Sequence, residues 1–143
     1  MIAVDTNVLV YAYRPEAPEH GAAAAAVRRL LTGTDTWAIP WTVAYEFLSV
    51  VTQPRIWRQP ASPVEALTAL DAWSDAGGAV FLAEGGGHRA VLSRLIGQGP
   101  VRGGRVFDAR VAATCLDHGV RELWSVDRDF SRFAGLRVVN PLL

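Results

Sequence analysis

Short apolar runs alternate along this chain with longer segments in which apolar residues recur every three or four positions. Short apolar runs are typical of the buried strands of a parallel sheet, and the longer periodicity is typical of helices with one apolar face. The sequence predicts strands at residues 2–5, 36–39, 79–82, 122–126 and 137–139, and helices at residues 7–13, 20–31, 41–52, 63–76, 88–96 and 106–118. Strands separated by helices indicate an α/β domain with a mainly parallel sheet.

Proline and glycine residues supply several of the predicted element boundaries. Pro15 interrupts the first helical segment, and Gly33 follows the second as its stop. Ser62 precedes the fourth helix, with a proline directly after it and Glu65 three positions on. This is the form of a capping box, in which Ser62 accepts a backbone hydrogen bond and Glu65 reaches back to the cap.

Composition limits the number of domains, the binding partners and the reactions that are possible for this chain. The chain has 143 residues, half of them hydrophobic, which is enough for one domain with one core covering residues 1–143. The 14 basic residues balance the 14 acidic ones, so no global positive field favours nonspecific binding to DNA. All the basic residues are arginine, which excludes any reaction that needs a lysine amine.

Three features of the sequence predict a reducing, cytoplasmic setting with no membrane contact. Cys115 is the only cysteine, so no disulfide can form within the chain. Residues 1–13 lack a basic leader and contain Asp5, which does not fit a signal peptide. Residues 36–54 are poor in charge but contain Glu46, so this segment fits a buried helix better than a membrane span.

Four carboxylates stand in apolar surroundings, where a charge is costly. Asp5 and Asp127 follow predicted strands, and the carboxyl ends of parallel strands are where ligand sites form. Glu46 is the only charge between residues 36 and 54, and helical spacing aligns Asp108 with apolar positions of its helix. We therefore expect all four side chains to point inward.

Each acid also has a structural interpretation. Asp5 and Asp127 could cap a helix or a turn, Asp108 could complement a helix N-terminus, and Glu46 could pair with a distant arginine. The four together are harder to explain in this way, because no basic residue shares their segments on the predicted inward face. A divalent cation is the expected counter-charge, and ligands that are all oxygen favour Mg²⁺ or Mn²⁺.

Such a cluster suits hydrolysis of a phosphodiester bond, because a hard cation would activate a bound water and offset charge on the phosphate. Asn7 and Ser125 are candidates to orient the carboxylates, and each is equally plausible as a turn residue. Asp129 lies two positions after Asp127. We expect the strand to end at Val126 or Asp127, so that Asp127 joins the site and Asp129 caps the following turn.

Four motifs, in order along the chain, resemble those of the PIN-domain family. A hydrophobic strand is followed by Asp-Thr-Asn, a helix carries a single acidic residue, Asp-Ala precedes small aliphatic residues, and Ser-x-Asp-x-Asp-Phe closes the set. These motifs occupy residues 2–9, 43–48, 106–113 and 123–130. Ser125 stands where threonine is commoner in the family, a change that keeps the hydroxyl group.

The resemblance implies a PIN fold, a three-layer α/β/α domain, and endoribonuclease activity that depends on Mg²⁺ or Mn²⁺. It implies that Asp5, Glu46, Asp108 and Asp127 hold the metal and form the catalytic site. The length of the chain resembles that of the virulence-associated protein C (VapC) toxins of type II toxin–antitoxin systems, which act on RNA and typically form homodimers. Their small antitoxin blocks the site, and we expect it to insert a basic residue among the four acids.

Basic residues near the motifs have two interpretations. Five arginines surround the third and fourth motifs, and they could contact phosphate or remain solvated. They are Arg102, Arg105, Arg110, Arg128 and Arg132. Arg55, Trp57 and Arg58 form a loop in which the tryptophan either anchors the loop, the favoured interpretation, or stacks on single-stranded RNA.

Two other function classes compete with a ribonuclease. A magnesium-dependent phosphotransfer domain would also place an aspartate after the first strand, but such domains typically use a lysine that this chain lacks. A catalytically silent PIN-type module would bind RNA or protein, although a pure binder would not need a crowded anionic pocket. Cleavage that depends on metal would separate these interpretations.

Overall fold

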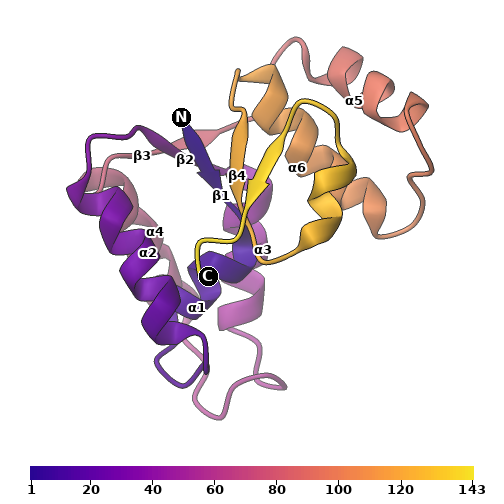
Figure 1. Cartoon of the computed structure of the whole chain (residues 1–143). Helices are drawn as coiled ribbons and strands as arrows, with labels where there is room; N and C mark the ends of the chain where they lie inside the picture. The colour runs from indigo at the N-terminus through magenta and orange to yellow at the C-terminus, as the bar shows by residue number, and fades with distance from the viewer.

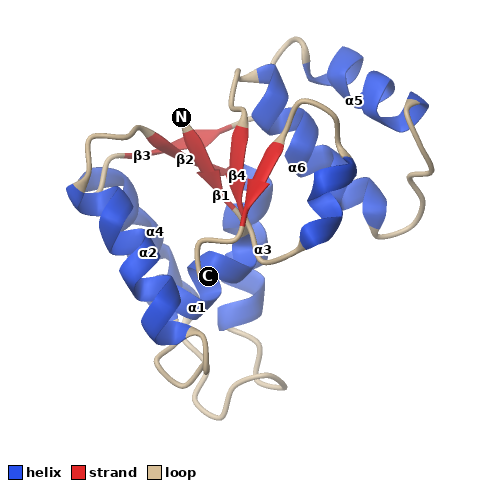
Figure 2. Cartoon of the chain, viewed as in Figure 1, coloured by secondary structure: helices blue, strands red, loops and turns tan.

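The computed structural model describes all 143 residues and contains one five-stranded sheet in which every pairing is parallel (Figure 2). The strand order is β3-β2-β1-β4-β5. The strands are β1 (Ile2–Val4), β2 (Trp37–Pro40), β3 (Ala79–Leu82), β4 (Glu122–Trp124) and β5 (Arg137–Val139). The predicted parallel α/β architecture is confirmed, and the clearest difference is that β4 ends two residues earlier than expected.

All six predicted helices form, with ends that differ from the prediction by one residue at most. They are α1 (Thr6–Tyr13), α2 (His20–Thr32), α3 (Trp41–Val51), α4 (Pro63–Asp75), α5 (His88–Gly97) and α6 (Arg105–Asp117), followed by the 3₁₀ helix η1 (Arg128–Arg132). Ser62 Oγ accepts the backbone N–H of Glu65 at 3.1 Å. The Glu65 side chain makes no return bond, so only half of the expected capping box forms.

The helices cover both faces of the sheet, which confirms the three-layer arrangement (Figure 1). The chain moves from β1 to β2 to β3 in one direction, then returns across the sheet to β4. Right-handed crossovers in opposite directions place their helices on opposite faces. Accordingly α1 to α4 pack on one another, and α5 packs on α6. No helix combines the length and the apolar character that a membrane crossing requires.

The sheet is packed around a buried core, and its strands β1 and β4 end side by side. Trp37, Phe47 and Leu123 are almost fully buried, and Cys115 is buried among the core side chains. Strands β1 and β4 lie side by side, although the chain leaves β1 on one side and reaches β4 from the other. The crevice outside the carboxyl ends of such a strand pair is the usual ligand site of an open α/β sheet.

Candidate active site

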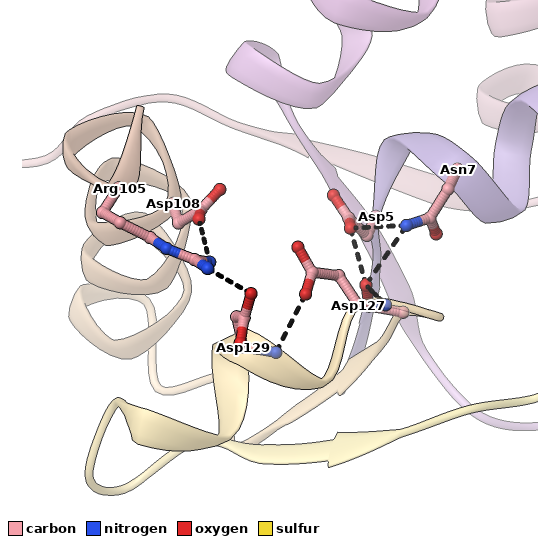
Figure 3. Close-up of polar contacts among 7 residues, drawn as sticks. Asp5, Asn7, Arg105, Asp108, Asp127 and Asp129 are labelled. Carbon is pink, nitrogen blue, oxygen red and sulfur yellow. Dashed lines mark hydrogen bonds and ion pairs between the residues drawn. The ribbon is translucent and has the colours of Figure 1, made fainter. Parts of the chain in front are cut away.

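Asp5 is the residue directly after β1, and both oxygens of its carboxylate accept hydrogen bonds; Figure 3 shows those to one of them. Its Oδ1 accepts the N–H of Thr6 at 2.8 Å, so it caps α1. Its Oδ2 accepts the Ser125 hydroxyl at 2.7 Å and the Asn7 amide at 3.3 Å. Only 7% of Asp5 is exposed. The cap interpretation is therefore confirmed, and the same contacts hold the carboxylate rigidly at the switch point of the sheet.

Asn7 and Ser125 connect the segment after β1 to the segment after β4. The Asn7 amide nitrogen lies 3.5 Å from Ser125 Oγ, and its Oδ1 accepts the N–H of Val126 at 3.4 Å. Ser125 Oγ also accepts the N–H of Asp127 at 3.0 Å. Both residues thus take the orienting positions considered from the sequence, since they link Asp5 to the backbone that carries Asp127.

Asp127, and not Asp129, caps the turn that follows β4. Asp127 Oδ1 accepts the N–H of Asp129 at 2.9 Å at the start of η1. The expectation that Asp129 is the cap is wrong because β4 ends at Trp124, so the turn begins earlier and its cap position moves to Asp127. The side chain of Asp129 pairs with Arg105 instead (Figure 3).

Asp108 has an arginine partner within its own helix, which the sequence analysis missed. The Arg105 guanidinium lies 3.1 Å from Asp108 Oδ2 and also pairs with Asp129 (Figure 3). The expectation that no basic residue shares the face of Asp108 is wrong, because α6 begins at Arg105, one residue earlier than predicted. The i,i+3 spacing of Arg105 and Asp108 was the available signal. The three side chains are between 26% and 47% exposed.

Glu46 lies on α3 at the exposed edge of the helix and is only partly covered by its neighbours, so its predicted burial among apolar residues is wrong. The buried face of α3 carries Val43, Ala44 and Phe47, and Glu46 borders the opening of a pocket that also contains Asp5. Glu46 forms no ion pair. The alternative in which a distant arginine neutralises it is therefore not what the fold provides.

The pKa values of three of the carboxyl groups are raised, and the charge of a neighbouring acid contributes to each of these shifts. Burial raises the pKa of Asp5 to about 6; the hydrogen bonds from Ser125 and Thr6 oppose this, and the charges of Glu46 and Asp108 add to it. Partial burial raises the pKa of Glu46, and the charge of Asp108 adds to it. The pKa of Asp108 is also raised by burial; Arg105 opposes this. Negative charge is thus costly here unless a cation is present.

Donor chemistry at this edge fits a hard divalent cation. The candidate ligands are all oxygen atoms. Thr6 Oγ1, a buried hydroxyl that the sequence analysis did not single out, has no partner except the nearby Glu46 carboxyl, whose pKa it lowers. No three carboxylates lie close enough together to hold a metal ion among themselves. Magnesium usually keeps several waters and binds through one or two carboxylates, so an open arrangement suits it.

Known proteins have a similar sequence or a similar fold. The chain matches the PIN domain family over residues 2–136. It is 36% identical over 142 residues to Ribonuclease VapC43 of Mycobacterium tuberculosis, covering 99% of this chain and 96% of that protein. The chain therefore belongs to the PIN-domain family. Within that family, its sequence similarity places it among the VapC ribonucleases.

Two solved structures confirm the fold at low sequence identity. One is VapC20 of Mycobacterium tuberculosis, described as a sarcin-ricin loop cleaving toxin, with a TM-score of 0.67, 17% identity and coverage of 96% of this chain and 99% of that one. The other is VapBC2 from Rickettsia felis bound to a DNA fragment from their promoter, with a TM-score of 0.69, 17% identity and coverage of 97% and 98%.

Proposed function

We propose that the chain is a metal-dependent endoribonuclease that hydrolyses RNA phosphodiester bonds with a metal-activated water, and that it is the toxin of a type II toxin–antitoxin pair. The observation that carries this proposal is the state of Asp5, which is buried, fixed by three hydrogen bonds, and has a pKa raised to about 6 beside two further acids. A buried carboxylate without a counter-charge destabilises the fold, and a bound cation would offset that destabilisation. Residues of this kind are typical of functional sites.

The cation in this proposal is Mg²⁺ or Mn²⁺, held by oxygen atoms of Asp5, Glu46, Asp108 and Asp127 together with water. When bound, it would lower the pKa of a coordinated water and offset negative charge on the scissile phosphate. The chain supplies orientation. Ser125 and Asn7 fix the Asp5 carboxylate, and the same serine holds the backbone of Asp127.

A silent binding module is the less supported alternative. Binding RNA or protein does not require carboxylates whose pKa values are raised by burial and by each other, as those of Asp5, Glu46 and Asp108 are. An accumulation of negative charge would instead repel an RNA backbone. A divalent cation removes this repulsion and gives the acids a catalytic use.

An antitoxin that inserts an arginine among Asp5, Glu46, Asp108 and Asp127 is the partner in this proposal. The pairing of Arg105 with Asp108 supports it, since a guanidinium fork already binds one of these carboxylates within the chain. The similar Rickettsia felis structure was solved as VapBC2. Substituting the partner's arginine should restore cleavage in the complex, and an inhibitor that leaves the four acids open to solvent would contradict this part of the proposal.

We also propose that the chain forms a homodimer through an exposed aromatic surface on α3 and α6. Phe107 is 68% exposed, Tyr45 is 69% exposed, and Trp41, which stacks on Phe81, is 40% exposed. Exposed aromatic groups of this size commonly mark interfaces. In sedimentation experiments Phe107→Arg should shift the chain toward the monomer, and an unchanged mass would count against this surface.

Cleavage of end-labelled single-stranded RNA tests the proposed activity. The wild-type chain should cut RNA with Mg²⁺ or Mn²⁺ and not with EDTA. Asp5→Asn and Asp108→Asn should lower cleavage by at least about 100-fold. Asp71→Asn is the matched control, because Asp71 is an exposed acid on α4 that belongs to none of the four motifs. Cleavage that persists in EDTA, or in both site variants, would overturn the proposal.

A further inference from the structure

A pocket of about 290 Å³ is lined by Asp5 and Glu46 together with apolar residues to which the proposed chemistry gives no role. Its size approaches the usual lower range for ligand sites, about 300 Å³. Its lining contains the two acids. The same lining also contains the apolar and aromatic side chains of Tyr11, Ile56 and Trp57. The pocket therefore joins the acidic edge of the sheet to an aromatic wall.

Trp57 is held rigidly in this wall. Its indole N–H donates to the carbonyl of Val50 at 2.8 Å, and the Arg14 guanidinium lies 4.5 Å from the centre of its ring. Arg14 is itself fixed by the carbonyl of Gln59, at 2.7 Å, and by Glu16. The interpretation of Trp57 as a loop anchor is confirmed. A fixed aromatic wall is also already organised for an occupant, so binding would not have to order it.

Thr6 lines the pocket with a buried hydroxyl. The residue is only 4% exposed, and apart from the nearby Glu46 carboxyl, whose pKa it lowers, its Oγ1 has no hydrogen-bond partner. A hydroxyl can both donate and accept, so one that donates to a carboxylate still has acceptor lone pairs free. An occupant with a polar edge would satisfy it, whereas a purely apolar occupant would not.

We infer that this pocket binds an unpaired nucleobase of the RNA substrate, next to the phosphate that the acids engage. The inference rests on the proposed ribonuclease function. A nucleobase has flat apolar faces that suit the wall of Ile56 and Trp57, and a hydrogen-bonding edge that suits Thr6. Any RNA whose phosphate lies at Asp5 and Glu46 carries a base adjacent to that phosphate, and these two acids also line the pocket. An antitoxin arginine at the acids would bring a protein segment to the same place, and the variants below distinguish that occupant from a base.

The isoleucines offer a direct probe that needs neither metal nor cleavage. The chain has four, and two are similarly exposed: Ile56 in the pocket, at 56%, and Ile96 on α5 at the opposite face of the sheet, at 45%. With methyl-labelled isoleucine, adenosine, cytidine, guanosine and uridine are titrated separately, with ribose as the control. At least one nucleoside should shift the Ile56 methyl signal saturably, because a stacked ring changes its magnetic environment. Ribose should not shift it, and the Ile96 signal should stay fixed.

Equal shifts with ribose, or no shift with any nucleoside, would overturn the inference while leaving the proposed ribonuclease function standing. A saturable nucleoside shift in a chain that cleaves no RNA would instead support the pocket and overturn the proposed activity. The two failures are therefore distinguishable.

Paired variants extend the test to RNA. Ile56→Ala should raise the KM for RNA by about tenfold, with a smaller change in kcat, and should alter the base preferred beside the cut. Ile96→Ala should leave both unchanged. Ile56→Trp, which fills the pocket, should abolish the nucleoside shift of a second pocket probe, the Thr6 methyl group. A pocket-filling variant that lost only binding of a protein inhibitor, with RNA cleavage unaltered, would assign the pocket to that partner and contradict a base site.

Discussion

The acidic site has two parts, which differ in how their carboxylates are stabilised: the β1 arm, formed by Asp5, and the α6 arm, formed by Asp108 and Asp129. On the β1 arm, Asp5 is 7% exposed and has neutral hydrogen-bond donors but no cation. On the α6 arm, Asp108 and Asp129 are partly open to water and share the guanidinium of Arg105. The first arm leaves a buried negative charge without a counter-charge, whereas the second supplies one from within the chain.

Because of this difference, the two arms should affect the stability of the fold and the binding of a cation to different extents. A half-exposed ion pair contributes little to folding, because water already screens its charges. A buried carboxylate without a cation lowers the free energy of unfolding. Its raised pKa has the same cause, because burial disfavours the charged form. The β1 arm is therefore where a bound cation should change the molecule most, and the α6 arm is where substitutions should matter least for stability.

The largest effect is expected from Asp5→Asn. Removing the buried charge should raise the free energy of unfolding of the metal-free chain at pH 7 by about 1–3 kcal/mol, while cleavage is lost. Urea denaturation in EDTA measures the first effect. A variant that is markedly less stable than the wild-type chain would mean that the charge of Asp5 stabilises the fold. The difference between the two arms would then be contradicted.

The pH dependence of stability sharpens the same contrast. The pKa of Asp5 is about 6 in the folded chain and about 4 when unfolded, so folding favours the protonated form. The stability it contributes is fully present below about pH 4 and is lost as the pH rises through about 6. Denaturation in EDTA between pH 4 and pH 7 should show this decline for the wild-type chain. Asp5→Asn should show a weaker decline, and an equal one would reassign the effect to other groups.

A smaller effect is expected at η1. Asp127→Ala removes the cap on the N–H of Asp129 and should lower the free energy of unfolding by about 1 kcal/mol, with a large loss of cleavage. Asp129→Ala removes only the partly exposed pair with Arg105 and should cost less than about 0.5 kcal/mol. Thermal unfolding of both variants decides the order. A larger loss for Asp129→Ala would return the cap to that residue.

The smallest change in stability is expected from Arg105→Gln. Its ion pairs are partly exposed, so the free energy of unfolding should change by less than about 0.5 kcal/mol. The affinity for Mn²⁺ should rise, because a competing positive charge leaves Asp108. Calorimetric titration of Mn²⁺ measures this affinity, and weaker binding in the variant would mean that Arg105 organises the carboxylates and does not compete for them.

The sequence predicted the regular part of the fold well and the site less completely. Apolar periodicity located every helix to within one residue, since burial of an apolar face dictates where a helix lies. The same reasoning placed Asp5 correctly but wrongly buried Glu46, because a single charge in an apolar helix can occupy the exposed edge of that helix. Periodicity also missed Arg105, whose pairing depends on where α6 begins and on how η1 packs beside it.

The pocket could not be predicted at all, because its walls come from segments far apart in the chain. Tyr11 lies on α1, and Trp57 lies in the loop after α3, held by a carbonyl of that helix. The sequence offered two roles for Trp57 and favoured loop anchoring, but it could not show which residues the tryptophan contacts. Only the packing of α1 against α3 brings the aromatic wall to the acids.

Metal-linked stability tests the central claim, that Asp5 is a costly acid retained to bind a cation. The free energy of unfolding is measured for the wild-type chain and for Asp5→Asn across a Mn²⁺ titration. We expect Mn²⁺ at about 100 times its dissociation constant to stabilise the wild-type chain by about 2.7 kcal/mol, with little effect on Asp5→Asn. Equal stabilisation of both chains, or none of the wild-type chain, would contradict the claim.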